Sequence, residues 1–358
     1  MNKALFLTTW PTSLGQGSGT ALFIRSLRQA VEAGGTQVEF VNPTLDTRDY
    51  VQFTLDRFWF NVEFARDPRP AQADWILGLD YDGFALPRQS DRPFVASVRA
   101  VFADLIDTEP DPFRTMLRAQ AYFEGQNVRR ADWITTPSAY AKGKIVEYYG
   151  VNESKVYAIP NGIDLVEWDA HWAAIPEPDR ARRPTLLAVS KLYPRKKIET
   201  LIRAVPLLRQ HLPDIDVRIV GGGFEWDALQ RLTIELGVGD NVTWLGDIND
   251  RRRVVAEFKH CHVFTHPSIQ DAFANVCLES MAAAKPLVVS DAASMPGLVR
   301  ESNSGLVVPP NDPAALAAAL SDLLHAEARR DELGDNGRRY AEKMTWQNTA
   351  EQFMNLIP

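Results

Sequence analysis

Residues 266–310 read HPSIQDAFANVCLESMAAAKPLVVSDAASMPGLVRESNSGLVVPP. The polar start of this stretch is typical of a loop, whereas the apolar spacing from Val276 onward predicts a helix. Asp271 then lies just before the helix start, and Glu279 lies about two turns into the helix. The amides of residues 272–276 lack intrahelical partners there and, with the helix dipole, favour an anion. Two carboxylates beside such a site suit a ligand that carries both a phosphate and sugar hydroxyls.

Each carboxylate alone also has a plainer interpretation, in which Asp271 favours the helix dipole and Glu279 lies on the surface. The whole string resembles the nucleotide-sugar signature of family-4 retaining glycosyltransferases: Glu-Gly-Phe, a short gap, and Glu-Ala-Met-Ala-Ala-Gly-Lys-Pro. Here the sequence has Asp271-Ala-Phe and then Glu279-Ser-Met-Ala-Ala-Ala-Lys-Pro, and residues 305–313 fit the same pattern. The departures are Asp271, Ala272 and Ala284, and the shorter Asp271 reaches less far toward a sugar hydroxyl.

Length and composition indicate a soluble protein with two domains. A chain of 358 residues exceeds the size at which one core usually keeps growing. The net charge of −7 argues against nucleic-acid binding. The two cysteines, Cys261 and Cys277, cannot form a disulfide framework or a four-thiolate zinc site, and they are interpreted as core residues in a reducing compartment.

The sequence also contains no membrane-spanning signal. No run of about 18 apolar residues is found, and the apolar start is too short for a secretory segment. We therefore expect a cytoplasmic protein without a transmembrane segment, and peripheral membrane contact stays open. The aromatic-rich residues 56–64 are interpreted as a core element, with an acceptor-binding or membrane-contacting surface as the alternative.

The first half opens with a predicted βαβ unit. Residues 3–9 and 37–41 are predicted strands, and residues 21–31 carry apolar side chains at helical spacing. The glycine-rich loop between them lies at the carboxyl end of the first strand, so Gly17 and Gly19 are donor-site candidates. The glycines do not match the Gly-x-Gly-x-x-Gly dinucleotide fingerprint, and a plain tight turn is the alternative.

Two acceptor-side candidates, Asp82 and Arg99, follow predicted strands at 74–80 and 94–98. Parallel sheets bind ligands beyond these carboxyl ends. Arg99 stands where many relatives in the resembled family carry a histidine, and this chain has no histidine in its first 170 residues. Arg99 could hold an anionic acceptor or a donor phosphate through its planar donors. The equal alternative is a salt bridge with Asp104 or Asp107.

Residues 159–164 resemble the family's crossing into the second domain, and residues 169–184 are the predicted linker. A strand at 185–189 precedes SKLYPRKK, which is similar to the family's Gly-Arg-Leu, gap, Pro-Glu-Lys-Gly motif. Lys191 and Lys196 take the positions of the two cations that grip the diphosphate in the family. A solvated basic loop is the alternative.

The remaining donor-side candidates lie in loops that follow predicted strands or at the start of the central helix. These are Gly222 in a glycine turn, Ile248 as a wall for the nucleobase, and Ala272, Phe273, Ala274 and Asn275. His266 borders them, although a lone loop histidine is more often structural.

The resemblance implies an α/β fold of the GT-B type, with two doubly wound Rossmann-like domains facing across a cleft. Residues 1–168 would bind the acceptor, with a C-terminal helix at 342–358 packing back on them, and residues 169–341 would bind the nucleotide sugar. The implied donor is a UDP-, GDP- or ADP-sugar. The implied acceptor is a hydroxyl of a carbohydrate, a lipid-linked molecule or a small molecule.

The resemblance also implies transfer with retention of configuration and without a metal or other cofactor. Lys191, Lys196 and the amides of residues 272–275 would replace a divalent ion electrostatically. Glu279 would hold the ribose, and Asp271 the hydroxyls of the transferred sugar. Two alternatives remain: a sugar-nucleotide epimerase of the same fold, and a non-catalytic relative that binds a sugar nucleotide or carbohydrate.

Overall fold

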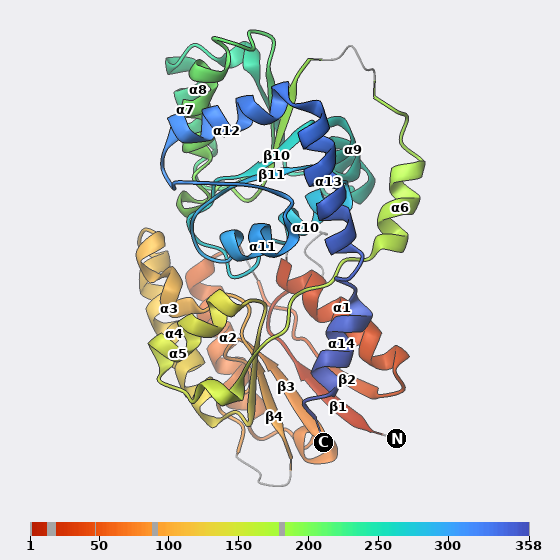
Figure 1. The fold of residues 1–358 in the computed structure, drawn as a ribbon. Coiled ribbons are helices and arrows are strands. Elements are labelled where there is room, and N and C mark those ends of the chain that lie inside the picture. The colour runs from red at the N-terminus through yellow and green to blue at the C-terminus, as the bar shows by residue number, and fades with distance from the viewer. Residues whose placement is uncertain (1, 13–18, 47, 88–91, 179–182, 358) are drawn as a thin grey trace. The chain divides into compact units, whose positions relative to one another are not determined.

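The computed structural model describes residues 2–12, 19–46, 48–87, 92–178 and 183–357, and it divides into two compact units. The first unit comprises Met1–Gly162 and Trp346–Pro358, and the second comprises Ile163–Thr345. Each is an α/β unit built on a parallel sheet that has six strands within the described residues (Figure 1). The predicted fold class, two doubly wound α/β domains, is confirmed.

The first sheet has the strand order β2-β1-β3-β4-β5-β6. Its strands are β1 (Lys3–Leu7), β2 (Gln37–Val41), β3 (Trp75–Leu79), β4 (Phe94–Ser97), β5 (Trp133–Thr136) and β6 (Val156–Ala158). Leu5 and Leu7 point to one face and Ala4 and Phe6 to the other, and all four are buried. Because both faces of β1 are buried, its sequence is a continuous apolar run.

Helices cover both faces of the first sheet. They are α1 (Gly19–Ala33), α2 (Tyr50–Phe64), α3 (Phe102–Leu105), α4 (Phe113–Arg130), α5 (Ala139–Tyr149) and α14 (Trp346–Met354), with 3-10 turns at Arg69–Gln72, Ile106–Thr108 and Glu153–Lys155. Gly35 (φ 90°) follows α1 and Gly150 (φ 63°) caps α5, as the glycine positions predict. Figure 1 shows the C-terminal α14 alongside α1.

The second sheet has the order β12-β11-β10-β7-β8-β9. Its strands are β7 (Thr185–Val189), β8 (Asp216–Val220), β9 (Val242–Gly246), β10 (Val263–His266), β11 (Leu287–Ser290) and β12 (Gly305–Val308). Strand order reverses between β7 and β10. In doubly wound sheets such a reversal opens the crevice in which ligands bind.

The second unit packs two layers of helices on this sheet. Apolar residues of α7 (Ile198–Leu208), α8 (Trp226–Glu235) and α12 (Pro313–His325) form one core with Leu186, Val217 and Val288. Residues of α6 (Leu165–Ala173), α9 (Arg251–His260), α10 (Asn275–Ala282) and α11 (Met295–Ser302) form the other. α13 (Glu327–Ala341) packs on α10, and 3-10 turns lie at Pro194–Lys196 and Gly239–Asn241.

The structure places the division between the units at Gly162, whereas the sequence suggests residue 168. Residues 169–173 of the predicted linker belong to α6, whose Trp168 packs on Phe258 with ring centroids 5.6 Å apart. The amide of Ile163 donates to the carbonyl of Met344, at 2.7 Å. These contacts tie residues after Gly162 to the second unit.

Helix α14 should contribute substantially to the stability of the first unit. The rings of Trp346 and Phe353 lie 6.3 and 6.0 Å from that of Phe23 on α1, and Phe353 is 1% exposed. We expect Phe353→Ala to lower the free energy of unfolding by about 3–5 kcal/mol in chemical denaturation, because it empties a packed site. The exposed control Glu351→Ala should change it by less than about 0.5 kcal/mol. Equal effects of the two substitutions would contradict this.

Candidate functional site

The loops that follow β7, β8, β9 and β10 gather at the carboxyl edge of the second sheet. The amide of Ile269, after β10, donates to the carbonyl of Arg195, after β7, at 2.8 Å. The amide of Leu192 donates to the carbonyl of Gly222, after β8, at 2.9 Å. These bonds join the loops after β7, β8 and β10 at the point where the strand order reverses, and the predicted residues Lys191, Lys196, Gly222 and Asp271 lie on them.

Lys196 and Asp271 meet in an ion pair, although they are distant in sequence. Their side chains are 11% and 20% exposed. His266, the last residue of β10 and 2% exposed, places Nε2 at 2.8 Å from Oδ2 of Asp271. Because an ionised carboxylate only accepts, Nε2 carries the proton in this pair. His266 is therefore part of the site rather than a bordering residue.

The charges of this cluster follow from its contacts. Burial by itself would raise the pKa of Asp271, but the charge of Lys196 and the hydrogen bond from His266 hold that pKa well below its usual range. Burial lowers the pKa of His266, so the imidazole is neutral at neutral pH. Both contacts fall on Oδ2, and Oδ1 accepts no hydrogen bond from the described residues. A ligand hydroxyl could therefore bind at Oδ1.

Lys191 pairs with Asp247, a residue that the sequence analysis missed. Its Nζ lies 2.7 Å from Oδ1 of Asp247, and both side chains are about half exposed. The same oxygen accepts from the amide of Gly222, at 3.0 Å. A side chain at Gly222 would place Cβ at 2.8 Å from Asp247 Oδ2. An acidic residue directly after a predicted strand is the signal that could have revealed Asp247.

The glycine turn after β8 is required by close packing against the loop after β7. Gly221 has φ 130°, and a Cβ there would lie 1.8 Å from the carbonyl oxygen of Ser190. Gly223, with φ 156°, would meet Leu192 in the same way. Only glycine allows both the backbone conformation and the approach.

Glu279 lies one turn into α10, and its side chain is 11% exposed. Its Oε1 accepts from Nη1 of Arg251, at 2.5 Å. The guanidinium of Arg251 lies 5.0 Å from the ring centroid of Trp168. The interpretation of Glu279 as a surface residue is therefore wrong, and Arg251 and Trp168 are further site residues that the sequence analysis did not find.

Helix α10 begins later than the sequence suggests. Ala274 is its N-cap with extended backbone (ψ 90°), so Ala272, Phe273 and Ala274 lie in the loop and only Asn275 is helical. The reason is that the side chains of Ala272 and Ala274 are buried, at 6% and 3% exposure, which holds the loop against the core. Phe273 packs against the same core and is partly buried. No side chain caps this helix start.

Three further donor-side candidates are Gly17, Gly19 and Ile248. Gly19 is the first residue of α1, whereas Gly17 lies outside the described residues. Ile248 follows β9 by two residues and packs, partly buried, against the core that contains α10.

Asp82 lies in a buried network at the carboxyl edge of the first sheet. It is 0% exposed and accepts from the amide and hydroxyl of Thr9, both at 2.7 Å, and from Asn61 at 2.9 Å. Arg57 approaches it to 3.7 Å. In this structure Asp82 holds Thr9 and Arg57 in place rather than facing a ligand. The spacing of Arg57 and Asn61, one helical turn apart among aromatic residues, is the signal for this network.

Arg99 forms neither of the predicted salt bridges among the described residues. Its Nη2 donates to Oδ1 of Asn161, and its guanidinium carbon lies 3.7 Å from the ring centroid of Phe23. Its backbone amide donates to Asp80, at 2.8 Å. The side chain is directed toward α1 and away from Asp104 and Asp107.

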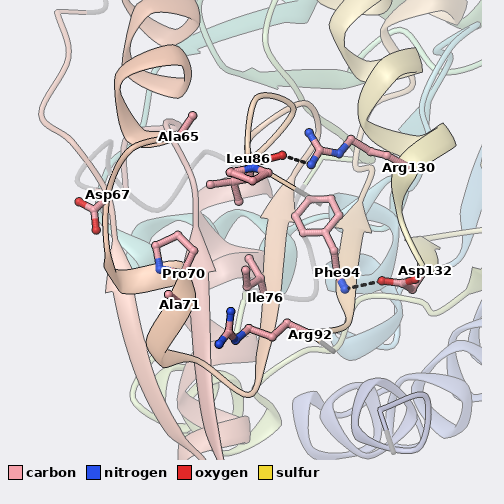
Figure 2. A pocket seen from close by; sticks show the side chains of 11 residues that line it. Ala65, Asp67, Pro70, Ala71, Ile76, Leu86, Arg92, Phe94, Arg130 and Asp132 are labelled. Atoms are coloured by element: carbon pink, nitrogen blue, oxygen red, sulfur yellow. Dashed lines mark hydrogen bonds between the residues drawn. The ribbon is translucent and has the colours of Figure 1, made fainter. Parts of the chain in front are cut away.

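A small pocket of about 70 Å³ lies in the first unit, at the opposite edge of the sheet (Figure 2). Ile76 and Phe94, at the amino ends of their strands, line it. Arg130 donates to the carbonyl of Leu86, and Asp132 accepts from the amide of Phe94 at 2.9 Å. Arg130 and Asp132 are thus engaged with backbone groups, and the pocket's volume is well below the roughly 300 Å³ of small ligand sites. It is not the donor site.

Two further findings concern the described ranges only. No group of three or more His, Cys, Asp or Glu side chains gathers there in a way that could hold a metal ion. No helix in these ranges combines the length and the apolar character that crossing a bilayer requires.

Two family models cover most of the sequence. Residues 175–340 match the model described as glycosyl transferases group 1, and residues 17–167 match the one described as glycosyltransferase family 4. The chain belongs to glycosyltransferase family 4. The family predicted from the signature around Asp271 is confirmed.

Curated relatives of this family-4 chain are identical to it at just over a quarter of the aligned residues. The GDP-mannose-dependent alpha-(1-6)-phosphatidylinositol monomannoside mannosyltransferase of Mycolicibacterium smegmatis is 29% identical over 63% of this chain and 62% of its own. The D-inositol 3-phosphate glycosyltransferase of Streptomyces scabiei is 28% identical over 77% of this chain and 64% of its own. The alignments thus span just under two thirds of these relatives.

The fold of the family-4 chain has solved counterparts. The sucrose-phosphate synthase of Thermosynechococcus elongatus superimposes with a TM-score of 0.82 at 21% identity, covering 99% of this chain and 98% of that one. Anabaena HepE, solved in complex with UDP, gives a TM-score of 0.71 at 17% identity, covering 99% of both chains. At these identities the likeness shows a common fold.

Burial of His266 leads to a pH-dependent stability. Because its folded pKa lies below the ordinary value of 6.5, the unfolded chain binds more protons at mildly acidic pH. The contribution of neutral His266 is thus present above about pH 6.5 and decreases as pH falls. The substitution His266→Gln keeps an N–H donor for Asp271 but removes this titration. We expect it to reduce the slope of the unfolding free energy against pH, between pH 7.5 and 5, by at most about 1.4 kcal/mol per pH unit.

The control for this experiment is His211→Gln, because His211 is exposed. It should leave the pH dependence of the unfolding free energy as in the unsubstituted protein. Parallel curves for the unsubstituted protein and His266→Gln, in urea titrations at each pH, would contradict the assignment.

Proposed function

We propose that this protein is a retaining glycosyltransferase that moves a sugar from a nucleotide diphosphate sugar to an acceptor hydroxyl without a metal ion. The observation that carries the proposal is the cluster of Lys196, Asp271 and His266 beside the uncapped start of α10. It combines a cation, a carboxylate with one available oxygen, and an anion-favouring helix start. Family membership supports sugar transfer, and the curated relatives supply the chemical class.

In this proposal, different charged residues bind different parts of the donor molecule. Lys191 and Lys196 balance the diphosphate, and Glu279 accepts the ribose hydroxyls. Asp271 accepts a hydroxyl of the transferred sugar at Oδ1. Gly222 allows close approach of the backbone, and Ile248 packs against the nucleobase. Preorganised charges of this kind stabilise the charge that develops on the leaving diphosphate.

The reaction requires no nucleophilic side chain in this proposal. The bond from the sugar's anomeric carbon to the diphosphate oxygen breaks, and a bond to the acceptor oxygen forms on the same face. The acceptor proton passes to the departing diphosphate. The cation of Lys196 stabilises the negative charge that grows on the diphosphate. Burial lowers the pKa of Lys196, but the charge of Asp271 favours its protonated form.

One observation favours a second candidate, a protein that binds sugar nucleotides without transferring the sugar. Each charged side chain predicted for the donor side already has a protein partner: Lys191 has Asp247, Lys196 has Asp271, and Glu279 has Arg251. A site whose charges are neutralised in this way could bind a donor without activating it. The two candidates differ in whether the donor turns over when an acceptor is present.

The first test is thermal stabilisation by UDP-, GDP- and ADP-sugars in the presence of a metal chelator. GDP-mannose is the first member of the panel because a curated relative depends on it. A donor at a hundred times its Kd should add about 2.7 kcal/mol of stability. Lys196→Ala should abolish the selective shift, whereas Arg203→Ala, which removes a cation from an exposed ion pair on α7, should preserve it.

A folded protein that responds to none of these donors would contradict the proposal. If one donor binds, incubation with candidate acceptors and NMR of the anomeric proton should show a product with the donor's anomeric configuration. Inversion of configuration would contradict the retaining mechanism, and a donor that stays intact with every acceptor would favour the binding protein.

Arg251 should position Glu279 for the ribose. Loss of the 2.5 Å hydrogen bond leaves a nearly buried carboxylate without its partner and free to rotate. We expect Arg251→Met to raise the donor KM about tenfold with kcat changed less than about twofold, since a charged hydrogen bond is worth about 1.5 kcal/mol or more. The control is Arg253→Met, an exposed position on the same helix. A fall in kcat at unchanged KM would assign Arg251 to the chemical step.

A further inference from the structure

Arg99 carries a buried cation that no acidic residue in the described parts of the chain neutralises through an ion pair. The residue is 8% exposed. Nη2 donates to the neutral side chain of Asn161, whereas Nη1 is buried and has no hydrogen-bond partner. Buried charges and buried N–H groups are normally paired, so an unpaired guanidinium nitrogen calls for an explanation.

Arg57, a second buried arginine of the same unit, does have a neighbouring carboxylate. Arg57 is 0% exposed, donates to Thr9 at 2.6 Å and lies 3.7 Å from the carboxylate of Asp82. Burial works to lower the pKa of Arg57, but nearby acidic groups, Tyr81 and Asp82 foremost, raise it overall. For Arg99, burial prevails and lowers the pKa to about 9. Only Arg57 has a counter-charge within ion-pair distance.

The Arg99 guanidinium lies close to the positive end of a helix. It lies 3.7 Å from the ring centroid of Phe23, one turn into the fifteen-residue α1. The first turn of α1 contains no acidic residue that would offset its dipole. A planar guanidinium and a helix N-terminus are each suited to phosphate and carboxylate groups. Here both occur at the carboxyl edge of one parallel sheet, where such sheets bind ligands.

We propose that Arg99, beside the start of α1, binds an anionic group, a phosphate or a carboxylate, of the acceptor. The assignment to an acceptor rests on the proposed function, in which the donor diphosphate is held by Lys191 and Lys196 of the second unit. The acceptor class is therefore a sugar or polyol phosphate, or a sugar acid. Its neutral parent should be a poor substrate, because the Arg99 cation would stay unpaired.

The closing experiment measures binding in the full chain without donor, so it does not depend on sugar transfer. The probes are glucose 6-phosphate, inositol 1-phosphate and glucuronate, each against its neutral parent, and inorganic phosphate. Thermal stabilisation by at least one anionic probe, absent with its neutral parent, is expected. Arg99→Met should weaken that binding at least tenfold, and Arg99→Lys less so. Arg118→Met, at an exposed arginine of α4, should bind as the unsubstituted protein does.

The outcomes separate this proposal from the proposed function. Binding of anionic probes that is lost in Arg99→Met but kept in Lys196→Ala supports the acceptor site, whether or not a donor is turned over. Equal binding by Arg99→Met and the unsubstituted protein would overturn it. Loss of UDP or GDP binding in Arg99→Met, with no response to the anionic probes, would assign Arg99 to the donor and also overturn it. If Arg99→Met does not fold, Arg99→Lys and Arg99→Gln provide the same comparison.

Discussion

The ion pair of Lys196 and Asp271 is the interaction on which the second unit's site depends. It joins the loop after β7 to the loop after β10, and these strands are neighbours because the strand order reverses between them. Removing one partner would leave the other charge largely buried, which costs about 3–5 kcal/mol in comparable pairs. The hydrogen bond from Ile269 to Arg195 and the imidazole of His266 fix the same two loops. These contacts order the side chains of Lys196 and Asp271 before a ligand binds.

The remaining charges of this site follow the same pattern. Lys191 is held by Asp247, and Glu279 by Arg251, which lies against Trp168. A diphosphate and a ribose would compete with these protein partners or share them. The exposed Lys191 pair is easily exchanged, since surface ion pairs contribute at most about 1 kcal/mol. The nearly buried Glu279 pair is harder to separate, because loss of its partner would leave a largely desolvated charge.

The first unit uses buried charge differently. Asp82, Arg57, Thr9 and Asn61 form a network in which each charged group has a partner, and it stabilises the loops after β1 and β3. Arg99 lies at the same sheet edge, forms no ion pair with any residue that the structure describes, and has a buried Nη1 without a hydrogen-bond partner. Both guanidinium groups pack on aromatic rings, but Arg57 also lies 3.7 Å from the carboxylate of Asp82, whereas Arg99 donates to the neutral side chain of Asn161. Arg57 is thus part of a satisfied structural network, whereas Arg99 is the arginine that we propose binds the anionic group of the acceptor.

The sequence by itself determined the family and the two α/β units, because apolar runs, glycine turns and the spacing from Asp271 to Glu279 are local signals. Only the tertiary structure decided which charges meet. Neither the pairing of Asp247 with Lys191 nor that of Arg251 with Glu279 could be predicted, since strand order, not spacing, brings them together. Burial likewise moved the start of α10 to Asn275 and enclosed Asp82. Sequence spacing fixes which residues share an element, whereas the environment of each charge depends on contacts between elements that lie far apart in the chain.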